Sequence, residues 1–321
     1  MQRGSTLEQL PLGTDQQKAV IDTARRSLAS IVLGKDAEIS LALSCLLARG
    51  HLLIEDLPGL GKTILAQSLA RVLGLSFQRI QFTSDLLPAD IVGVSVFRQQ
   101  EGAFVFQPGP VFSQLVLADE VNRATPKAQS ALLEAMEERQ VTVDGKTHEL
   151  PDPYFVVATQ NPSDQIGTFQ LPESQLDRFL MRLELGYPNE ENERELITGI
   201  DRREMLNDIT PSLHPEMLLD LQKSAAKVHM SEPLVDYIQA LIRFTRESPD
   251  IETGLSPRGA LALVAAARAH AFMEHHSGVF PDDVQAVFGP VAGHRLKPAS
   301  SSAYRTPGEL SRHVLDNVAI P

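Results

Sequence analysis

Short apolar runs alternate with longer helical patterns in the first part of the chain. Apolar residues return at helical spacing over residues 14–32, and a second helical stretch runs from 34 to 48. The apolar run 52–54 leads through a Pro- and Gly-containing turn into a helical pattern over 63–73. Further predicted strands are 77–82, 115–118, 155–158 and 179–185. This alternation predicts an α/β fold whose mostly parallel sheet is covered by helices on both faces.

Two β-hairpins are expected to interrupt this plan. The short, mostly apolar runs 94–97 and 103–106 lie on either side of the polar, Gly-containing segment 98–102. Residues 140–143 and 147–150 flank Asp144 and Gly145, a dipeptide typical of tight hairpin turns. Both hairpins lie within the predicted α/β region.

The pattern becomes helical from about Pro188 onward. Helices are predicted over 190–203, 215–227, 233–246, 257–275 and 281–292, several with Pro near the first turn. We therefore expect two domains: an α/β nucleotide-binding domain over 1–188, which contains both hairpins, and a small all-α lid domain over 189–321.

Composition narrows the possible functions. The 29 Lys and Arg against 41 Asp and Glu give a net charge of −12, a field that repels nucleic-acid phosphates and makes nucleic acid an unlikely partner. Cys45 is the only cysteine, which excludes an intrachain disulfide and fits a reducing compartment. No apolar run approaches the roughly 20 residues that cross a bilayer, and no signal-peptide pattern begins the sequence. We expect a cytoplasmic protein without direct membrane insertion.

The strongest chemical signal is a phosphate-binding loop between a predicted strand and a predicted helix. Glycines let backbone amides approach phosphate oxygens, Lys62 supplies a cation to the phosphates, and Thr63 offers a hydroxyl to Mg²⁺. The usual pattern has another glycine where this chain has Asp56, so we expect that carboxylate to point away from the phosphates. The alternative is a Gly-rich turn that only caps a helix. The candidate ATP-binding residues are Leu57, Pro58, Gly59, Leu60, Gly61, Lys62 and Thr63.

Two acids follow the apolar run 115–118. In a P-loop ATPase, Asp119 at the end of such a strand joins Thr63 in holding Mg²⁺, and Glu120 activates the attacking water. Taken alone, an Asp-Glu pair after a strand is more often a solvated turn, and the P-loop upstream favours the catalytic interpretation. No Cys and His spacing typical of a zinc site is present, so magnesium is the only metal implied.

Four further segments give a specific resemblance. The segments DEVNRA (119–124), QSALLEAMEE (129–138), ATQNP (158–162) and LPESQLDRF (171–179) resemble the MoxR group of AAA+ ATPases. The similarity runs from about residue 13 into the helical lid. It implies an AAA+ core with a lid, and it implies that the two hairpins lie near the central opening of a ring.

The resemblance also assigns roles to three residues. Asn161 corresponds to the polar sensor of the γ-phosphate or of the attacking water, and Arg178 to the arginine finger that reaches a neighbouring subunit's nucleotide. Arg258 resembles the second sensor arginine, and whether it acts in cis or in trans stays open. The alternatives are an Asn-Pro turn for Asn161, a surface pair of Asp177 with Arg178, and an exposed first-turn arginine at 258.

The expected function is that of a ring-forming ATPase, hexameric by the resemblance, that uses ATP and Mg²⁺. The resemblance implies chaperone-like remodelling, assembly or metal-cofactor activation of protein clients, with a von Willebrand factor A domain in the client. A nucleic-acid motor or transcriptional regulator is an alternative, and a magnesium-chelatase-type subunit is another. A further alternative is a protein that binds nucleotide as a switch and hydrolyses it negligibly.

Overall fold

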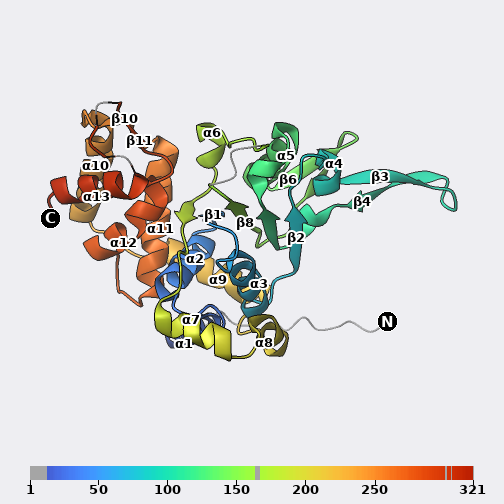
Figure 1. Cartoon of the computed structure of the whole chain (residues 1–321), viewed down its shortest axis with the longest axis horizontal. Helices are drawn as coiled ribbons and strands as arrows, with labels where there is room; N and C mark the ends of the chain where they lie inside the picture. The colour runs from blue at the N-terminus through green and yellow to red at the C-terminus, as the bar shows by residue number, and fades with distance from the viewer. Residues whose placement is uncertain (1–12, 163–166, 301, 305, 321) are drawn as a thin grey trace.

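The computed structural model describes residues 13–162, 167–300, 302–304 and 306–320, and its centre is a five-stranded parallel sheet (Figure 1). The strand order is β2-β5-β8-β1-β9, and every neighbouring pair is parallel. The α/β fold with a mostly parallel sheet is thus confirmed. The strands are β1 (Leu52–Glu55), β2 (Phe77–Gln81), β5 (Leu115–Asp119), β8 (Phe155–Gln160) and β9 (Met181–Leu183).

Both faces of the sheet are buried, because side chains alternate along each strand and helices cover each face. In β1, Leu52 and Ile54 belong to the cluster of buried side chains beneath α1, α2 and α3, whereas Leu53 belongs to the cluster with α4 and α5. This explains why the central strands are continuous apolar runs. The helices are α1 (Thr14–Ala29), α2 (Asp36–Leu47), α3 (Lys62–Val72), α4 (Pro88–Val92) and α5 (Pro126–Glu138).

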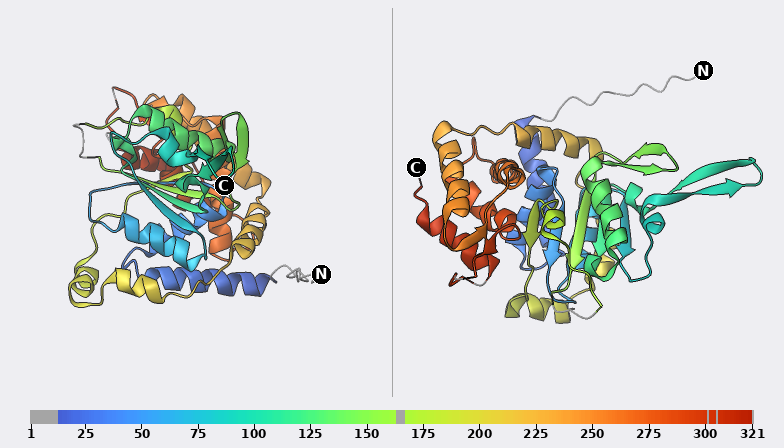
Figure 2. Two further views of the ribbon diagram at one scale, coloured as in Figure 1. Left: turned by 90° about the vertical axis from the view of Figure 1, so that its right-hand side faces the viewer. Right: turned by 90° about the horizontal axis from the view of Figure 1, so that it is seen from above.

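The two expected hairpins are present and project from the same end of the molecule, away from the lid (Figure 2). The longer one joins β3 (Gly93–Arg98) to β4 (Ala103–Pro108), and the shorter one joins β6 (Gln140–Val143) to β7 (Lys146–Glu149). The predicted turn at Asp144 and Gly145 has positive φ at both residues, 50° and 74°. The hairpins touch where Phe106 stacks on His148 with ring centroids 3.9 Å apart.

The lid is built from helices, as expected, with one addition. A two-stranded antiparallel pair, β10 (Ile251–Thr253) with β11 (Lys297–Pro298), joins the helices at one side. The last helix, α13, was not predicted from the apolar pattern. The lid helices are α9 (Pro215–Ala226), α10 (Glu232–Glu247), α11 (Pro257–Met273), α12 (Pro281–Ala292) and α13 (Pro307–Asn317).

The single helix predicted over 190–203 is wrong. Two helices occupy this region, α7 (Glu190–Thr198) and α8 (Arg202–Asp208), with a break at Gly199. The Gly199 amide donates to the Glu195 carbonyl oxygen to close α7, after which the backbone becomes extended. Asp201 then starts α8, because its side chain accepts a hydrogen bond of 2.8 Å from the Arg203 amide. α8 packs against α3.

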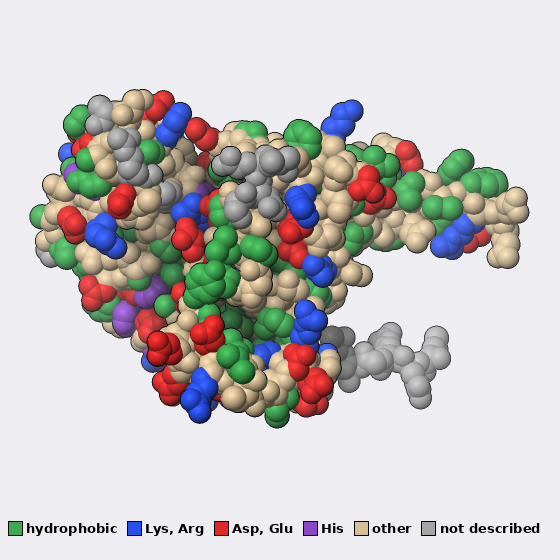
Figure 3. All heavy atoms as spheres, viewed as in Figure 1, with side chains coloured by type: hydrophobic (Ala, Val, Ile, Leu, Met, Phe, Trp, Pro, Cys, Tyr) green, Lys and Arg blue, Asp and Glu red, His purple; other side chains and the backbone are tan. Residues whose placement is uncertain are grey.

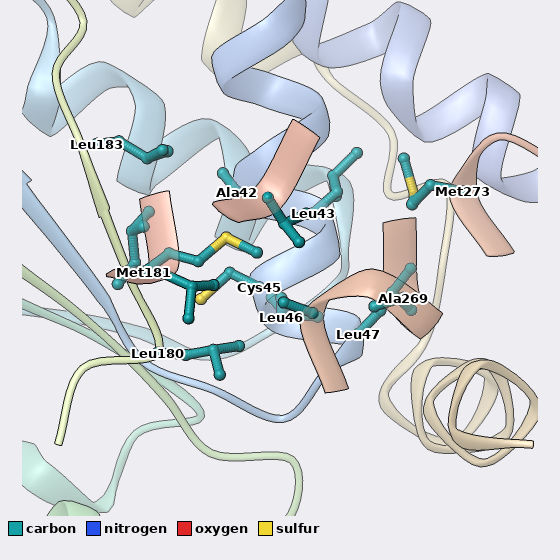
Figure 4. Close-up of a cluster of buried hydrophobic side chains, with 14 of the residues drawn as sticks. Ala42, Leu43, Cys45, Leu46, Leu47, Leu180, Met181, Leu183, Ala269 and Met273 are labelled. Atoms are coloured by element: carbon teal, nitrogen blue, oxygen red, sulfur yellow. The ribbon is translucent and has the colours of Figure 1, made fainter. Parts of the chain in front are cut away.

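One continuous cluster of buried side chains joins the sheet to the lid (Figure 4). Leu46 of α2 and Met181 of β9 lie in it together with Ala269 of α11. Cys45 lies in the same cluster, where burial raises the pKa of its thiol and keeps it protonated. Because the packing runs on without a break, the division of the chain at 188 and 189 stays a prediction.

None of the helices in the described part of the chain is both long enough and apolar enough to cross a membrane. The cytoplasmic location stays a prediction.

His51, just before β1, ties three elements of the core together. Its Nδ1 accepts a 3.0 Å hydrogen bond from the Val156 amide, and its Nε2 lies 3.3 Å from the Met136 carbonyl oxygen. Nε2 therefore carries the proton of a neutral ring. Burial is the main reason that the pKa of His51 falls to about 4, and the nearby Arg139 guanidinium lowers it further.

Acid should destabilise the fold through His51. A pKa below the unfolded value of 6.5 means that protons bind the unfolded chain first, so stability present above pH 6.5 is lost as the pH falls toward 4. We expect His51 to account for about 2 kcal/mol of the loss between pH 7 and pH 5. Urea unfolding of the wild type and of His51→Gln at both pH values measures this contribution. An equal pH dependence in the two proteins would contradict it.

Candidate functional site

The predicted phosphate-binding loop connects the end of β1 to the start of α3. Gly59 and Gly61 have φ of 85° and 89°, a region that favours glycine, and a Cβ at either position would meet no atom within 4 Å. Backbone conformation, and not lack of space, therefore requires glycine at these two positions. Five of the seven candidate residues line one cavity of about 250 Å³: Pro58, Gly59, Gly61, Lys62 and Thr63. The other two do not: Leu60 lines a neighbouring cavity, and Leu57 lines a third one near α12.

Lys62 curls back over the loop. Its Nζ donates to the carbonyl oxygens of Asp56 at 2.5 Å and of Leu57 at 2.7 Å. Burial lowers the pKa of Lys62, while the carboxylates of Asp56, Asp119 and Glu120 act in the opposite direction. The ammonium group is thus held by two neutral carbonyl groups, which leaves its positive charge available to an incoming anion.

Asp56, the departure from the usual loop, points away from this cavity, as expected. Its Oδ2 accepts hydrogen bonds from the amides of Leu185 at 2.7 Å and Gly186 at 2.6 Å. Lys35 holds the same segment from the other side by donating to the carbonyl oxygens of Leu185 and Tyr187. These contacts fix the start of the lid connection to the phosphate-binding loop.

Asp119 and Glu120 lie at the carboxyl end of β5 and are tied together by Thr159 of the adjacent β8. The Thr159 hydroxyl donates to Asp119 Oδ1 at 2.6 Å and accepts from the Glu120 amide at 2.9 Å. Glu120 has the left-handed backbone φ of 56°, a strained conformation for a residue with a side chain. The bond to Thr159 helps to hold this conformation, which separates the directions of the two carboxylates.

Each carboxylate also has a basic or amide partner. Arg79 of β2 donates to Asp119 Oδ2 at 2.6 and 3.0 Å. Glu120 Oε2 accepts from Gln81 at 2.8 Å and from Arg123 at 3.0 Å. Sequence reasoning missed Arg79 and Gln81, because they come from β2 and carry no motif of their own, whereas Arg123 lies within the segment 119–124 but was given no role.

Asn161 follows β8 and lines the same cavity, together with Thr159 and Gln160. The side-chain nitrogen of Gln160 is buried and has no hydrogen-bond partner among the described residues. The cavity suits an anion, because Lys62 brings a positive charge to it, and the Thr63 hydroxyl and Asp119 carboxylate are the oxygen ligands that Mg²⁺ prefers.

A second cavity, of about 540 Å³, opens on the other side of the loop and is largely apolar. Tyr187 and Ile197 line it and are 72% and 78% exposed, which is high for apolar residues with no function. Ile31, Val32 and Ile64 line its inner part. A flat apolar base can bury its surface here while its phosphates extend over Gly59 and Gly61 into the first cavity. No sequence motif marks this cavity, and the apolar residues that line it are the signal that could have indicated it.

Arg178 and Arg258 are not in the phosphate cavity. They lie together in a separate cavity of about 190 Å³ and form ion pairs with the two carboxylate oxygens of Glu137. Arg178 Nη2 is 2.9 Å from Glu137 Oε2, and its Nη1 donates to the Leu133 carbonyl oxygen at 2.6 Å. Asp177 pairs with Arg295 at 2.6 Å, so the surface pair with Arg178 is not formed. Glu137 offsets the unfavourable position of Arg258 in the first turn of α11.

Comparison with known proteins agrees with this geometry. Residues 51–181 match the family described as "ATPase family associated with various cellular activities (AAA)", and residues 243–314 match the family described as "AAA lid domain". A crystal structure of a protein from Cytophaga hutchinsonii superposes with a TM-score of 0.86 at 35% identity, over 96% of this chain and 97% of that chain. Fold and site together define a P-loop ATPase of the AAA class.

Two relatives place the chain in a particular group within this class of ATPases. The uncharacterized protein YeaC of Bacillus subtilis (strain 168) is 42% identical over 91% of this chain and 92% of its own length. The chaperone MoxR1 of Mycobacterium tuberculosis is 38% identical over 97% of this chain and 86% of its own length. The chain belongs to the MoxR group of AAA+ ATPases, and it binds and hydrolyses ATP.

Substitutions of Lys62 and of Glu120 should impair different steps, ATP binding and ATP hydrolysis respectively. Replacing Lys62 by Ala removes the cation of the phosphate cavity, so we expect ATP affinity to fall at least about tenfold. Glu120→Gln keeps the shape of the side chain but not a base, so binding should persist while kcat falls about a hundredfold. Calorimetry with both variants and a turnover assay measure the two effects. Equal loss of ATP affinity in both variants would refute the role of Glu120.

Proposed function

We propose that the protein forms a ring, hexameric by its family resemblance, in which hydrolysis of Mg²⁺-bound ATP drives the remodelling, assembly or metal-cofactor activation of client proteins. The observation that carries this proposal is the cavity of about 250 Å³ in which Lys62, Thr63, Asp119, Glu120 and Asn161 meet. Phosphoryl transfer to water needs a cation, a metal site, a base and a polar group that orients the water, and these residue types supply all four.

In the proposed mechanism each residue has one task. Lys62 leaves its two carbonyl partners to bind the β- and γ-phosphates. Thr63 and Asp119 would hold Mg²⁺, whose charge would offset the negative charge of the phosphates. Glu120 accepts the proton of the attacking water, and Gln81 and Arg123 orient its carboxylate. Asn161 orients the same water or the γ-phosphate.

The separation of Arg178 and Arg258 from this cavity supports a role at a neighbouring subunit. Neither lines the phosphate cavity of its own chain, and both line the separate cavity of about 190 Å³. Glu137 keeps the two positive charges side by side by pairing with both. We assign Arg178 as the finger and Arg258 as a second trans-acting arginine at the same neighbouring nucleotide.

A trans-acting finger can be tested by mixing subunits. Arg178→Ala and Lys62→Ala should each be inactive alone, because one lacks the finger and the other lacks the phosphate site. Mixed rings contain interfaces that pair an intact loop with an intact finger, so turnover should return to a measurable fraction of the wild-type rate. The readout is steady-state ATP hydrolysis after mixing, with verification of mixed assemblies. Absence of recovery in such assemblies would count against a trans role.

The hairpins support a protein client. Val94, Val96, Phe97 and Phe104 of the β3-β4 hairpin are between 42% and 70% exposed, and the rings of Phe97 and Phe104 lie 5.3 Å apart. In the space-filling view, apolar side chains lie along this projecting arm (Figure 3). Exposed apolar side chains on a projecting hairpin suit contact with polypeptide. The name of the relative MoxR1, a chaperone, supports the same class of function.

The client itself is proposed from resemblance to the MoxR group, whose partners carry von Willebrand factor A domains. A nucleic-acid motor is less favoured, because the net charge of −12 does not gather phosphate backbones. A magnesium-chelatase-type subunit would use the same ATPase residues and differ only in its partner.

ATPase activity should therefore respond to a protein with a von Willebrand factor A domain and not to DNA. Steady-state hydrolysis is measured at low salt with single-stranded DNA, duplex DNA and the protein partner in turn, and again at higher salt. We expect a severalfold change with the protein partner, which Phe97→Ser with Phe104→Ser should weaken without loss of basal turnover. Strong stimulation by DNA that falls steeply with salt would replace this proposal by the nucleic-acid motor.

A further inference from the structure

We infer that Arg203, in the first turn of α8, binds the γ-phosphate end of the nucleotide held by its own subunit. The inference rests on the proposed roles of Lys62, Thr63 and Glu120. Arg203 lies between the two segments that match the AAA and lid families, and its position follows from the break between α7 and α8. It adds a second, cis-acting cation to the phosphate cavity.

The first observation is its position. Arg203 lines the cavity of about 250 Å³ together with Lys62, Thr63, Asp119 and Glu120. It also borders the adjoining cavity of about 680 Å³, which Thr63 shares. α8 packs on α3, the helix that begins with Lys62, so the guanidinium group approaches the phosphates from the side opposite β5 and β8.

The second observation is that the Arg203 guanidinium has no interaction partner among the described residues. Its backbone amide caps α8 through Asp201, but its side chain has no hydrogen bond or ion pair with any described residue. The neighbouring arginines are all engaged: Arg79 with Asp119, Arg202 with Glu195, and Arg71 with the Asn207 carbonyl oxygen. A free guanidinium at the rim of an anion cavity can form charge-assisted hydrogen bonds without first breaking an ion pair.

The third observation is the position of the other lid arginine. Arg258 is held beside Arg178 by Glu137, outside the phosphate cavity of its own chain. Among the described arginines of the C-terminal helices, Arg203 is thus the one that lines the phosphate cavity of its own chain. When it binds the γ-phosphate, it ties α8 to the nucleotide, and loss of that phosphate on hydrolysis frees α8 again. The alternative is a solvated arginine on an exposed helix with no ligand.

Measurements of nucleotide affinity distinguish an Arg203 that binds the γ-phosphate from one that is only solvated. With Mg²⁺ present, Arg203→Ala should weaken binding of a non-hydrolysable ATP analogue about tenfold and binding of ADP less than about threefold, because ADP lacks the γ-phosphate. Arg203→Lys should recover part of the loss. The matched control is Arg194→Ala, which removes the same charge from exposed α7 and lines none of these cavities. Thermal unfolding of all variants checks that they fold.

Equal affinities of Arg203→Ala and Arg194→Ala for the ATP analogue would overturn the inference. If that result accompanies a wild type that hydrolyses ATP and a Lys62→Ala variant that does not bind it, only the inference fails. A wild type that binds no nucleotide would overturn the proposed function as well.

Mixed rings then separate a cis role from a trans role. Arg203→Ala mixed with Arg178→Ala should recover turnover at low ATP, because the Arg178→Ala subunit keeps an intact site and receives a finger from its neighbour. Arg203→Ala mixed with Lys62→Ala should show no recovery, because each subunit then has a defect in its own site. Recovery in the second mixture would place Arg203 at the neighbouring nucleotide and overturn the cis assignment.

Discussion

The parallel hydrogen bonding of β5, β8 and β1 is the constraint on which the rest of the site depends. In this register Ala118 lies opposite Ala158 and Glu55 lies opposite Gln160, so the three strands end at one edge of the sheet. Asp119 is the last residue of β5, and the phosphate-binding loop, Glu120 and Asn161 follow directly after the strand ends. Because the strands are buried on both faces, a shift in register would expose apolar side chains, and this cost fixes the relative positions of the catalytic groups.

The same edge connects the nucleotide to the lid. Asp56 stands where the usual phosphate-binding loop has a glycine, and its carboxylate accepts hydrogen bonds from the amides of Leu185 and Gly186. Lys35 binds carbonyl oxygens of the same segment, so amides and carbonyls are both satisfied where the chain leaves β9. These contacts join the phosphate-binding loop directly to the segment that leads into α7.

The sequence predicted most of what local chemistry determines. The loop glycines and Lys62 follow one short apolar run, and Asp119 follows another. Because parallel strands end at the same edge of a sheet, the motifs and the predicted topology indicated the same site. The break at Gly199 depends on local contacts at the end of α7 and the start of α8, but the charged and apolar pattern continues through it, so one helix was predicted where two exist. Two other features depended on contacts between distant residues and carried no local signal. Thr159 and Glu137 act only through partners about 40 residues or more away in the chain.

The distribution of arginines explains why the proposed catalysis needs an assembly. A guanidinium near developing negative charge speeds phosphoryl transfer only if it is placed correctly and water is excluded. Arg203 approaches the chain's own cavity from an exposed helix, where solvent weakens its effect. Arg178 is fixed by Leu133 and Glu137, but in a cavity of its own. A neighbouring subunit that covers the phosphate cavity with this fixed arginine would supply the better placed charge and exclude water in one step, so hydrolysis would follow association.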